Sequence, residues 1–148
     1  MLEKAFLPSG GFIMATNIQR VLELAADKSN LGIPEDAQGV GEVKEPSCGD
    51  LLRIGFTTHR EIITQIGYTL TESACPPVFA CSSYITSLAK GQAVVAAYLI
   101  TWKDIAAALS DNGELNPEHI HCAMMAELAL KNAIVNYSQM KKEKLTER

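Results

Sequence analysis

The first regular pattern of apolar and polar positions in the chain begins after Asn17. Apolar residues recur there three and four positions apart, at Ile18, Val21, Leu22, Leu24 and Ala25. Residues at this spacing share one face of an α-helix. Asn30, Gly32 and Pro34 then interrupt the pattern, because they favour turns and helix ends. The sequence therefore predicts a first helix of about three turns, followed by an exposed loop.

The middle of the chain changes to segments typical of strands. Val40–Lys44 alternates weakly between apolar and polar residues, Leu51–Thr57 is mostly apolar, and Ile62–Leu70 is rich in β-branched and aromatic side chains. The polar stretch Thr58–Glu61 has the length of a hairpin connection between the last two. We therefore expect neighbouring strands to pair in antiparallel fashion.

The pattern becomes helical again after Cys75. Pro76 and Pro77 fix the backbone φ angle that a first helical turn needs. Apolar and small residues then continue at helical spacing as far as Gly91. Cys75 is therefore predicted to lie at a junction between a strand and a helix.

Further helical segments are predicted in the last third of the chain. A short helix covers residues 93–99, and another spans residues 102–109 after Thr101, whose hydroxyl suits a helix N-cap. Asn116 and Pro117 favour the start of a last, long helix. The order of helix, strands and helices predicts an α+β fold, in which a small antiparallel sheet of about three strands packs against several helices.

Length and composition predict a single domain. The chain has 148 residues, of which 47% are hydrophobic. This is enough for one domain with a buried core and too little for two. Proline and glycines break the apolar start of the chain, so we expect residues 1–16 to form a flexible extension. The domain itself is expected over residues 17–140, with a charged C-terminal tail over residues 141–148.

Charge and hydropathy exclude two classes of partner. The net charge of −4 argues against nucleic-acid binding, which normally requires a clustered basic face. No apolar run approaches the roughly 18 residues that cross a bilayer, so we expect no membrane segment. The chain contains four cysteines and no export signal, which together predict a reducing compartment, the cytoplasm.

Three cysteines, a histidine and an aspartate are the candidate metal ligands: Cys48, Asp50, Cys75, His121 and Cys122. Cys75 and Cys122 are both predicted near helix starts, where the helix dipole favours a thiolate. Three thiolates with one imidazole or carboxylate complete a tetrahedral zinc site, or supply the terminal ligands of a two-iron cluster. From the residues alone, both kinds of site stay open.

The remaining cysteine and histidines have simpler interpretations. Cys81 lies six residues beyond Cys75, about 240° around a helix, and therefore points away from any site that Cys75 faces. We predict that it is a small core residue. His59 is interpreted as a turn residue and His119 as a residue of a helix start, rather than as ligands.

The candidate ligands occur in motifs of recognisable order. The motifs are Cys48-Gly49-Asp50, a Cys75 that opens a serine-rich helix ending in Lys90-Gly91, and the stretch Ile120–Glu127 with the sequence IHCAMMAE. Over residues 38–138 the chain resembles the IscU/NifU-type iron–sulfur cluster assembly scaffold family. The resemblance implies that Cys48, Cys75 and Cys122 are the scaffold cysteines, and that Asp50 and His121 are assisting or alternative ligands.

The same resemblance implies a function. A member of this family is not an enzyme: a cysteine desulfurase supplies sulfur, an iron donor supplies iron, and a transient [2Fe-2S] cluster is built and passed to recipient iron–sulfur proteins. Zinc can occupy the same ligands when iron and sulfide are absent.

The chain also departs from the family pattern. Pro76 and Pro77 replace the small residues that usually follow the second cysteine. The segment Leu115–His119 keeps only a leucine and a proline of the family's Leu-Pro-Pro-Val-Lys chaperone-recognition segment, so the use of an Hsp70-type chaperone stays open. Two alternatives to the scaffold remain: a zinc-bound sulfur acceptor, and a degenerate relative with an interaction role.

Overall fold

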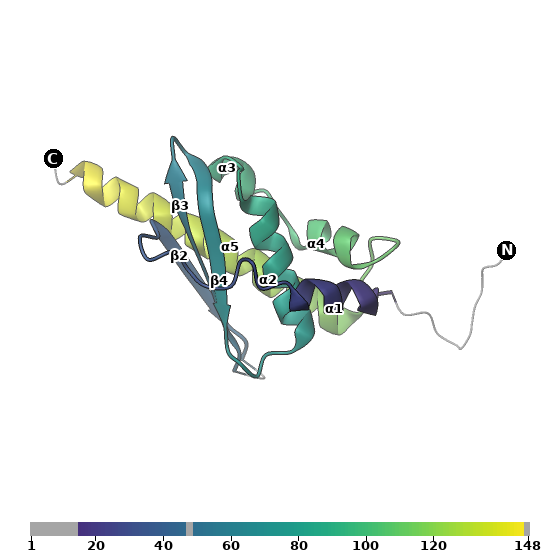
Figure 1. Ribbon diagram of the computed structural model, residues 1–148. Helices are drawn as coiled ribbons and strands as arrows, with labels where there is room; N and C mark the ends of the chain where they lie inside the picture. The colour runs from purple at the N-terminus through teal and green to yellow at the C-terminus, as the bar shows by residue number, and fades with distance from the viewer. Residues whose placement is uncertain (1–14, 47–48, 147–148) are drawn as a thin grey trace, which may run out of the picture.

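The structure is a computed structural model that describes residues 15–46 and 49–146. Figure 1 shows the order of its elements, with helices and strands in the arrangement predicted from the sequence. The elements are α1 (Ile18–Ala26), β2 (Gly39–Lys44), β3 (Leu51–His59), β4 (Ile62–Leu70), α2 (Pro76–Ala89), α3 (Val94–Ala97), α4 (Trp102–Leu109) and α5 (Pro117–Thr146). The predicted α+β fold, with a three-stranded antiparallel sheet and a long C-terminal helix, is confirmed.

The sheet has the strand order β2-β3-β4, and both pairs of neighbours are antiparallel. Strand β3 is two residues longer than predicted, because it continues through His59. The hairpin turn therefore consists of Arg60 and Glu61 alone, with φ angles of 52° and 67°. Positive φ at both central residues is what a tight two-residue hairpin turn requires. His59 accordingly lies at the end of a strand rather than in the turn.

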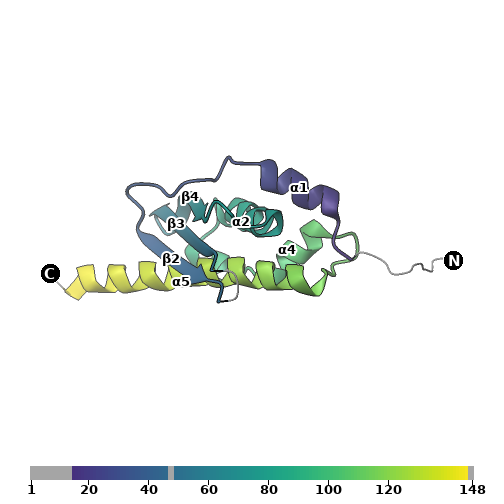
Figure 2. The same cartoon turned by 90° about the horizontal axis from the view of Figure 1, so that it is seen from below.

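The core lies between the sheet and two long helices. Leu52, Ile54 and Phe56 alternate along β3 toward this side and are completely buried. Ile85 of α2 and Leu130 of α5 are equally buried opposite them. Figure 2 shows α2 between α1 and α5, so that the sheet has helices on one face and α1 covers the far side of α2.

Helix α5 lies directly on strand β2 because a glycine there has no side chain. A Cβ added to Gly41 would come within 2.7 Å of the Ala129 carbonyl oxygen and 2.6 Å of the Asn132 carbonyl carbon. Asn136 fixes the same contact with its side-chain oxygen, which accepts a 2.9 Å hydrogen bond from the Val40 N–H. The helix is therefore held on the strand by backbone proximity as well as by side-chain packing.

The segments predicted to flank the domain, residues 1–16 and 141–148, are partly ordered where the structure describes them. Residues 1–14 of the predicted extension lie outside the described residues. Its last two residues contact the domain: Thr16 is buried and pairs with Ser110, and the Ala15 N–H donates to the Asn116 side chain at 3.1 Å. At the other end, α5 continues through Thr146, so most of the predicted tail is helical.

The tip of the β3–β4 hairpin is tied to α5 through one carboxylate. Glu61 accepts a hydrogen bond of 2.7 Å from Lys141 and one of 2.5 Å from the Tyr137 hydroxyl. These bonds lower the pKa of Glu61, and the bond from Lys141 has the largest effect. The same carboxylate raises the pKa of Lys141, whereas the pKa of Tyr137 is raised mainly by burial.

No helix in the described part of the chain is long and apolar enough to cross a membrane.

We predict that Gly41→Ala destabilises the fold by about 2 kcal/mol or more, because the added methyl group collides with the backbone of α5. Urea unfolding followed by circular dichroism measures the change in the free energy of unfolding. Glu42→Ala, at the neighbouring exposed position, is the control and should change it by no more than about 0.5 kcal/mol. Equal stability of the two variants would contradict the close contact.

We predict that Glu61→Gln lowers stability at neutral pH and that the difference from the parent protein disappears in acid. A carboxyl group whose pKa is lowered on folding stabilises the folded state above its ordinary pKa of 4.5, and this contribution is lost as the pH falls through the lowered value. Thermal unfolding of both proteins between neutral and acidic pH tests this. The pair is solvent-exposed, so the effect is small. A difference in stability between the two proteins that grows as the pH falls would contradict the prediction.

Candidate functional site

One end of the sheet brings together the segments that carry the predicted ligands. Strand pairing sets Lys44 opposite Leu51 and Leu52 opposite Leu70. The end of β2, the start of β3 and the end of β4 therefore lie side by side, at the lower end of the sheet in Figure 1. The Leu51 N–H donates a 2.8 Å hydrogen bond to the Thr71 hydroxyl, which ties the start of β3 to the segment that follows β4.

The first of these segments is the loop between β2 and β3. Its backbone closes on itself, because the Glu45 N–H donates to the Asp50 carbonyl at 2.8 Å and the Gly49 N–H donates to the Glu45 carbonyl at 2.7 Å. Gly49 has a φ of 77°, a conformation that few other residues adopt. Asp50 is buried at the base of the loop. Cys48 lies outside the described residues.

The second segment carries Cys75, which is the N-cap residue of α2. Its φ and ψ of −71° and 152° are extended, and its carbonyl accepts the Val78 N–H at 3.0 Å. Pro76 and Pro77 form the first helical turn. The predicted junction between strand and helix is confirmed, and the thiol of Cys75 is exposed to solvent.

The third segment is the beginning of α5, which carries His121 and Cys122. The Cys122 thiol is half-buried and donates to the Glu118 carbonyl one turn earlier, at 3.5 Å. The His121 side chain is exposed, and its Nε2 lies 2.5 Å from Oε2 of Glu45. This contact joins α5 to the loop that carries Cys48 and Asp50.

Glu45 belongs to the candidate site through its contact with His121, although it was not among the residues predicted from the sequence. Its side chain is only 12% exposed although it carries a carboxylate, and it faces His121 across the site. Histidines that bind metals commonly use their second ring nitrogen to bond a carboxylate, which fixes the tautomer and the ring orientation. With Nε2 engaged by Glu45, Nδ1 is the nitrogen that can present a lone pair. The sequence could have suggested Glu45 only as an acidic residue at a strand end, three positions before Cys48. No motif marks it.

The residues predicted not to be ligands occupy structural positions. Cys81 is completely buried, and burial raises the pKa of its thiol far above the usual range, with a smaller contribution from the charge of Cys122. The prediction of a core residue is confirmed. His119 hydrogen-bonds the Thr16 hydroxyl at 2.7 Å through Nδ1, so it anchors the start of α5 to the incoming chain.

The described residues do not assemble the full predicted ligand set. Within residues 15–46 and 49–146, no three His, Cys, Asp or Glu side chains are placed to hold a metal ion. The structure does bring the Cys48 loop to His121 through Glu45, and it places the segments of Cys75 and Cys48 at the same end of the sheet. The set of Cys48, Asp50, Cys75, His121 and Cys122 stays a prediction.

An apolar groove adjoins this end of the molecule. Its volume is about 600 Å³, and Glu45 and His121 line it together with Trp102, Met124 and Leu128. Met124 and Leu128 are about half exposed although both are large and apolar. The site is therefore open at the surface and bordered by apolar side chains.

The comparisons with known proteins cover nearly the whole described chain. The family model described as the NifU-like N terminal domain matches residues 16–144. The iron–sulfur cluster assembly scaffold protein IscU 1 of Archaeoglobus fulgidus is 36% identical over 118 residues, which cover 80% of this chain and 74% of that protein. The scaffold protein IscU of Aquifex aeolicus is 33% identical over 121 residues, with the same coverage of 80% and 74%.

The fold is also similar to a solved structure. It superposes with a TM-score of 0.63 on a candidate iron–sulfur cluster assembly scaffold protein for the SUF system from Fervidobacterium islandicum, at 16% identity, and the match covers 78% of this chain and 94% of that one. At this identity the likeness concerns the fold alone. The resemblance stated from the sequence is confirmed by the family model and the relatives: the chain belongs to the NifU-like N-terminal domain family, together with proteins named as IscU iron–sulfur cluster assembly scaffolds.

Proposed function

We propose that this protein is a scaffold on which a transient [2Fe-2S] cluster is assembled and from which it is passed to recipient proteins. In this proposal a cysteine desulfurase supplies sulfur and an iron donor supplies iron, and the protein itself is not an enzyme. The observation that carries the proposal is the convergence of the Cys48 loop, the Cys75 junction and the His121 end of α5, joined by the contact between Glu45 and His121. Relatives named as scaffolds support it.

The proposed ligands are Cys48, Cys75 and Cys122, with Asp50 or His121 completing the set. Thiolates suit iron–sulfur clusters, whereas carboxylate oxygen and imidazole nitrogen are exchangeable partners on the same ions. The exposure of Cys75 and His121 supports reversible loading, because water and partner proteins reach the ligands. Cargo bound by such a mixed and open set leaves more readily than cargo bound by buried thiolates.

Sulfur transfer to the site is a thiol exchange. A thiolate of the scaffold attacks the outer sulfur of the donor's persulfide, the sulfur–sulfur bond of the donor breaks, and the donor cysteine leaves as a thiolate. The scaffold cysteine becomes a persulfide, so this transfer balances in atoms and electrons. Release of the outer sulfur as the sulfide of a cluster takes two further electrons, which an external dithiol reductant supplies. Cys75 and Cys122 are the accessible acceptors among the described residues. Both require a reducing compartment such as the cytoplasm, which is the location that we propose.

A second candidate function is that of a zinc-bound sulfur acceptor. The observation that favours it is the pair of prolines in the first turn of α2, directly after Cys75. Prolines restrict the backbone, so this ligand moves less when cargo enters or leaves. Under this alternative the metal stays in place, and sulfur alone passes through the protein.

The segment that corresponds to the family's chaperone-recognition sequence is folded here. Leu115 is 5% exposed, Pro117 starts α5, and His119 is bonded to Thr16. The segment is thus partly buried at the start of α5 and keeps only two of the family's five residues. We therefore do not include such a chaperone in the proposed function.

We expect anaerobic reconstitution with iron, cysteine, a desulfurase and a dithiol reductant to produce the visible charge-transfer absorption of a [2Fe-2S] cluster. Cys75→Ser and Cys122→Ser should each lose most of this absorption, because each removes a thiolate ligand. Cys81→Ala is the matched control and should keep it, since Cys81 is a buried core residue. Colourless protein that retains one zinc ion and still accepts sulfur would refute the scaffold and support the alternative.

We expect Glu45→Ala to weaken zinc binding about tenfold, because His121 loses the carboxylate that fixes its tautomer. Competition with a chromophoric chelator measures the affinity, and nitrogen NMR of the imidazole reports which ring nitrogen carries the proton. The exposed Glu42, on the preceding strand β2, provides the control: Glu42→Ala makes the same change of charge and should bind zinc as the parent does. Unchanged affinity and tautomer in Glu45→Ala would show that the contact has no part in the site.

A further inference from the structure

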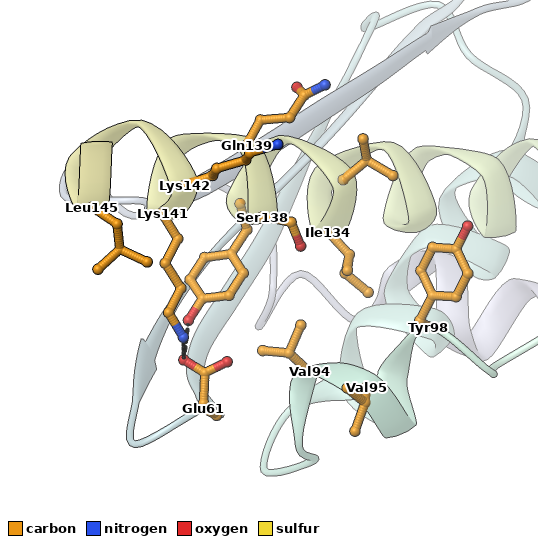
Figure 3. A pocket seen from close by; sticks show the side chains of 12 residues that line it. Glu61, Val94, Val95, Tyr98, Ile134, Ser138, Gln139, Lys141, Lys142 and Leu145 are labelled. Carbon is orange, nitrogen blue, oxygen red and sulfur yellow. Dashed lines mark hydrogen bonds and ion pairs between the residues drawn. The ribbon is translucent and has the colours of Figure 1, made fainter. Parts of the chain in front are cut away.

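A second apolar groove lies between α3 and the C-terminal half of α5, away from the candidate ligands. Its volume is about 660 Å³ (Figure 3). The apolar side chains that line it are Val94, Val95, Tyr98, Ile134, Val135 and Leu145. Neither the core of the fold nor the proposed cluster site accounts for this surface.

The groove has a buried floor and exposed apolar walls. Val94 and Ile134 are each 5% exposed and belong to the core. Val95 is 77% exposed on α3, and Leu145 is 61% exposed near the end of α5. Figure 3 shows both exposed side chains at the margins of the hollow, with Val94 and Ile134 between the two helices. A contiguous apolar surface of this kind, rimmed by polar groups, is typical of a protein interaction site.

Two lysines and one glutamate are the charged side chains that line the groove. Lys141 and Lys142 line it from α5, and Glu61 is the acidic residue among its lining side chains. Lys141 neutralises Glu61 in the ion pair at 2.7 Å. Lys142 makes no hydrogen bond or ion pair within the residues that the structure describes. The α3 wall carries no charged residue. Two lysines and one glutamate therefore give the lining side chains a net charge of +1, carried by Lys142, on a chain whose net charge is −4.

We infer that this groove binds an amphipathic helix of a partner protein that presents an apolar stripe flanked by acidic residues. Helices that dock in apolar grooves use side chains spaced three and four residues apart, and the apolar groove between α3 and α5 can receive such a stripe. Acidic flanks complement Lys142 and the rim as a whole, whereas a basic helix would be repelled. The charge of the rim is the argument for this occupant over a neutral or basic one.

The groove and the candidate ligands occupy opposite parts of the same helix. Cys122 and Lys142 are separated along α5 by about 30 Å, since each helical residue adds about 1.5 Å. Neither Cys75 nor Cys122 lines the groove, so a helix bound in it leaves both thiols uncovered. The inference does not rest on the proposed function, and its test requires neither metal nor cluster.

The probe is a fluorescently labelled amphipathic helical peptide of about four turns, with leucines on one face and glutamates beside them. A matched peptide carries lysines in place of the glutamates. Anisotropy titration of the full-length protein should show the acidic peptide binding at least about fivefold more tightly than the basic one. Chemical-shift changes in NMR spectra of the labelled protein should concentrate at Val95, Tyr98 and Leu145.

Two substitutions and their controls localise the binding. Val95→Ser should weaken the acidic peptide about tenfold, and Leu22→Ser, which removes an exposed leucine from α1, should not. Lys142→Glu should weaken the acidic peptide about fivefold and strengthen the basic one. Lys103→Glu makes the same change of charge on α4 and should leave both affinities unchanged. All four positions are exposed, and circular dichroism verifies that each variant is folded.

Several outcomes would overturn the inference. Equal affinity for the two peptides would refute an acidic partner helix. Chemical-shift changes away from α3 and α5 would refute the groove as the binding site. No binding of either peptide at millimolar concentration would do the same. A dimer in solution that Val95→Ser dissociates would assign the groove to a second copy of this chain instead.

Discussion

The contact between strand β2 and helix α5 is the constraint on which the rest of the molecule depends. Gly41 lets the backbone of the helix approach the strand to a distance that any side chain would prevent. This contact fixes the position of a helix of 30 residues relative to the sheet. Everything that α5 carries is thereby placed at once: His121 and Cys122 beside the loops at one end of the sheet, and the exposed apolar wall beyond Ile134 at the other. A change at the strand therefore acts on both ends of the helix.

Local patterns explain why most elements were predictable. Thr101 and Asp104 form the reciprocal cap that starts α4, with the Thr101 N–H donating to the Asp104 carboxylate at 2.9 Å, and such a cap depends only on residues three apart. The strands followed from β-branched and aromatic residues in the same way. The length of β3 was underestimated because Thr58 and His59 are polar, and the pairing that extends the strand to His59 comes from Ile62 and Ile63 across the hairpin. That information is not local.

The candidate site also depends on contacts that local sequence patterns do not predict. Motif order identified the family and predicted a set of ligands, but no motif marks Glu45, because its contact with His121 arises from strand register and from the placement of α5. The register brings the end of β2 to the site, and the helix then presents His121 within 2.5 Å of the carboxylate. The opposite applies to Cys81, where the helical angle from Cys75 was enough to place the side chain in the core. The direction in which a side chain points around its own helix can be predicted from sequence spacing. Contacts between different elements can be known only once the fold is known.

A single rigid helix that joins two separate surfaces has a consequence for how partners act. A partner held in the groove by one helix stays attached while another part of the same partner reaches the site about 30 Å away along α5. Attachment converts the second encounter into an intramolecular one, with effective concentrations in the millimolar range for a short flexible connection. Weak and reversible contact at the candidate ligands is then sufficient, because the groove and not the candidate site supplies the residence time. This division suits a scaffold, since cargo that must leave again cannot be held by the strength of its own ligands.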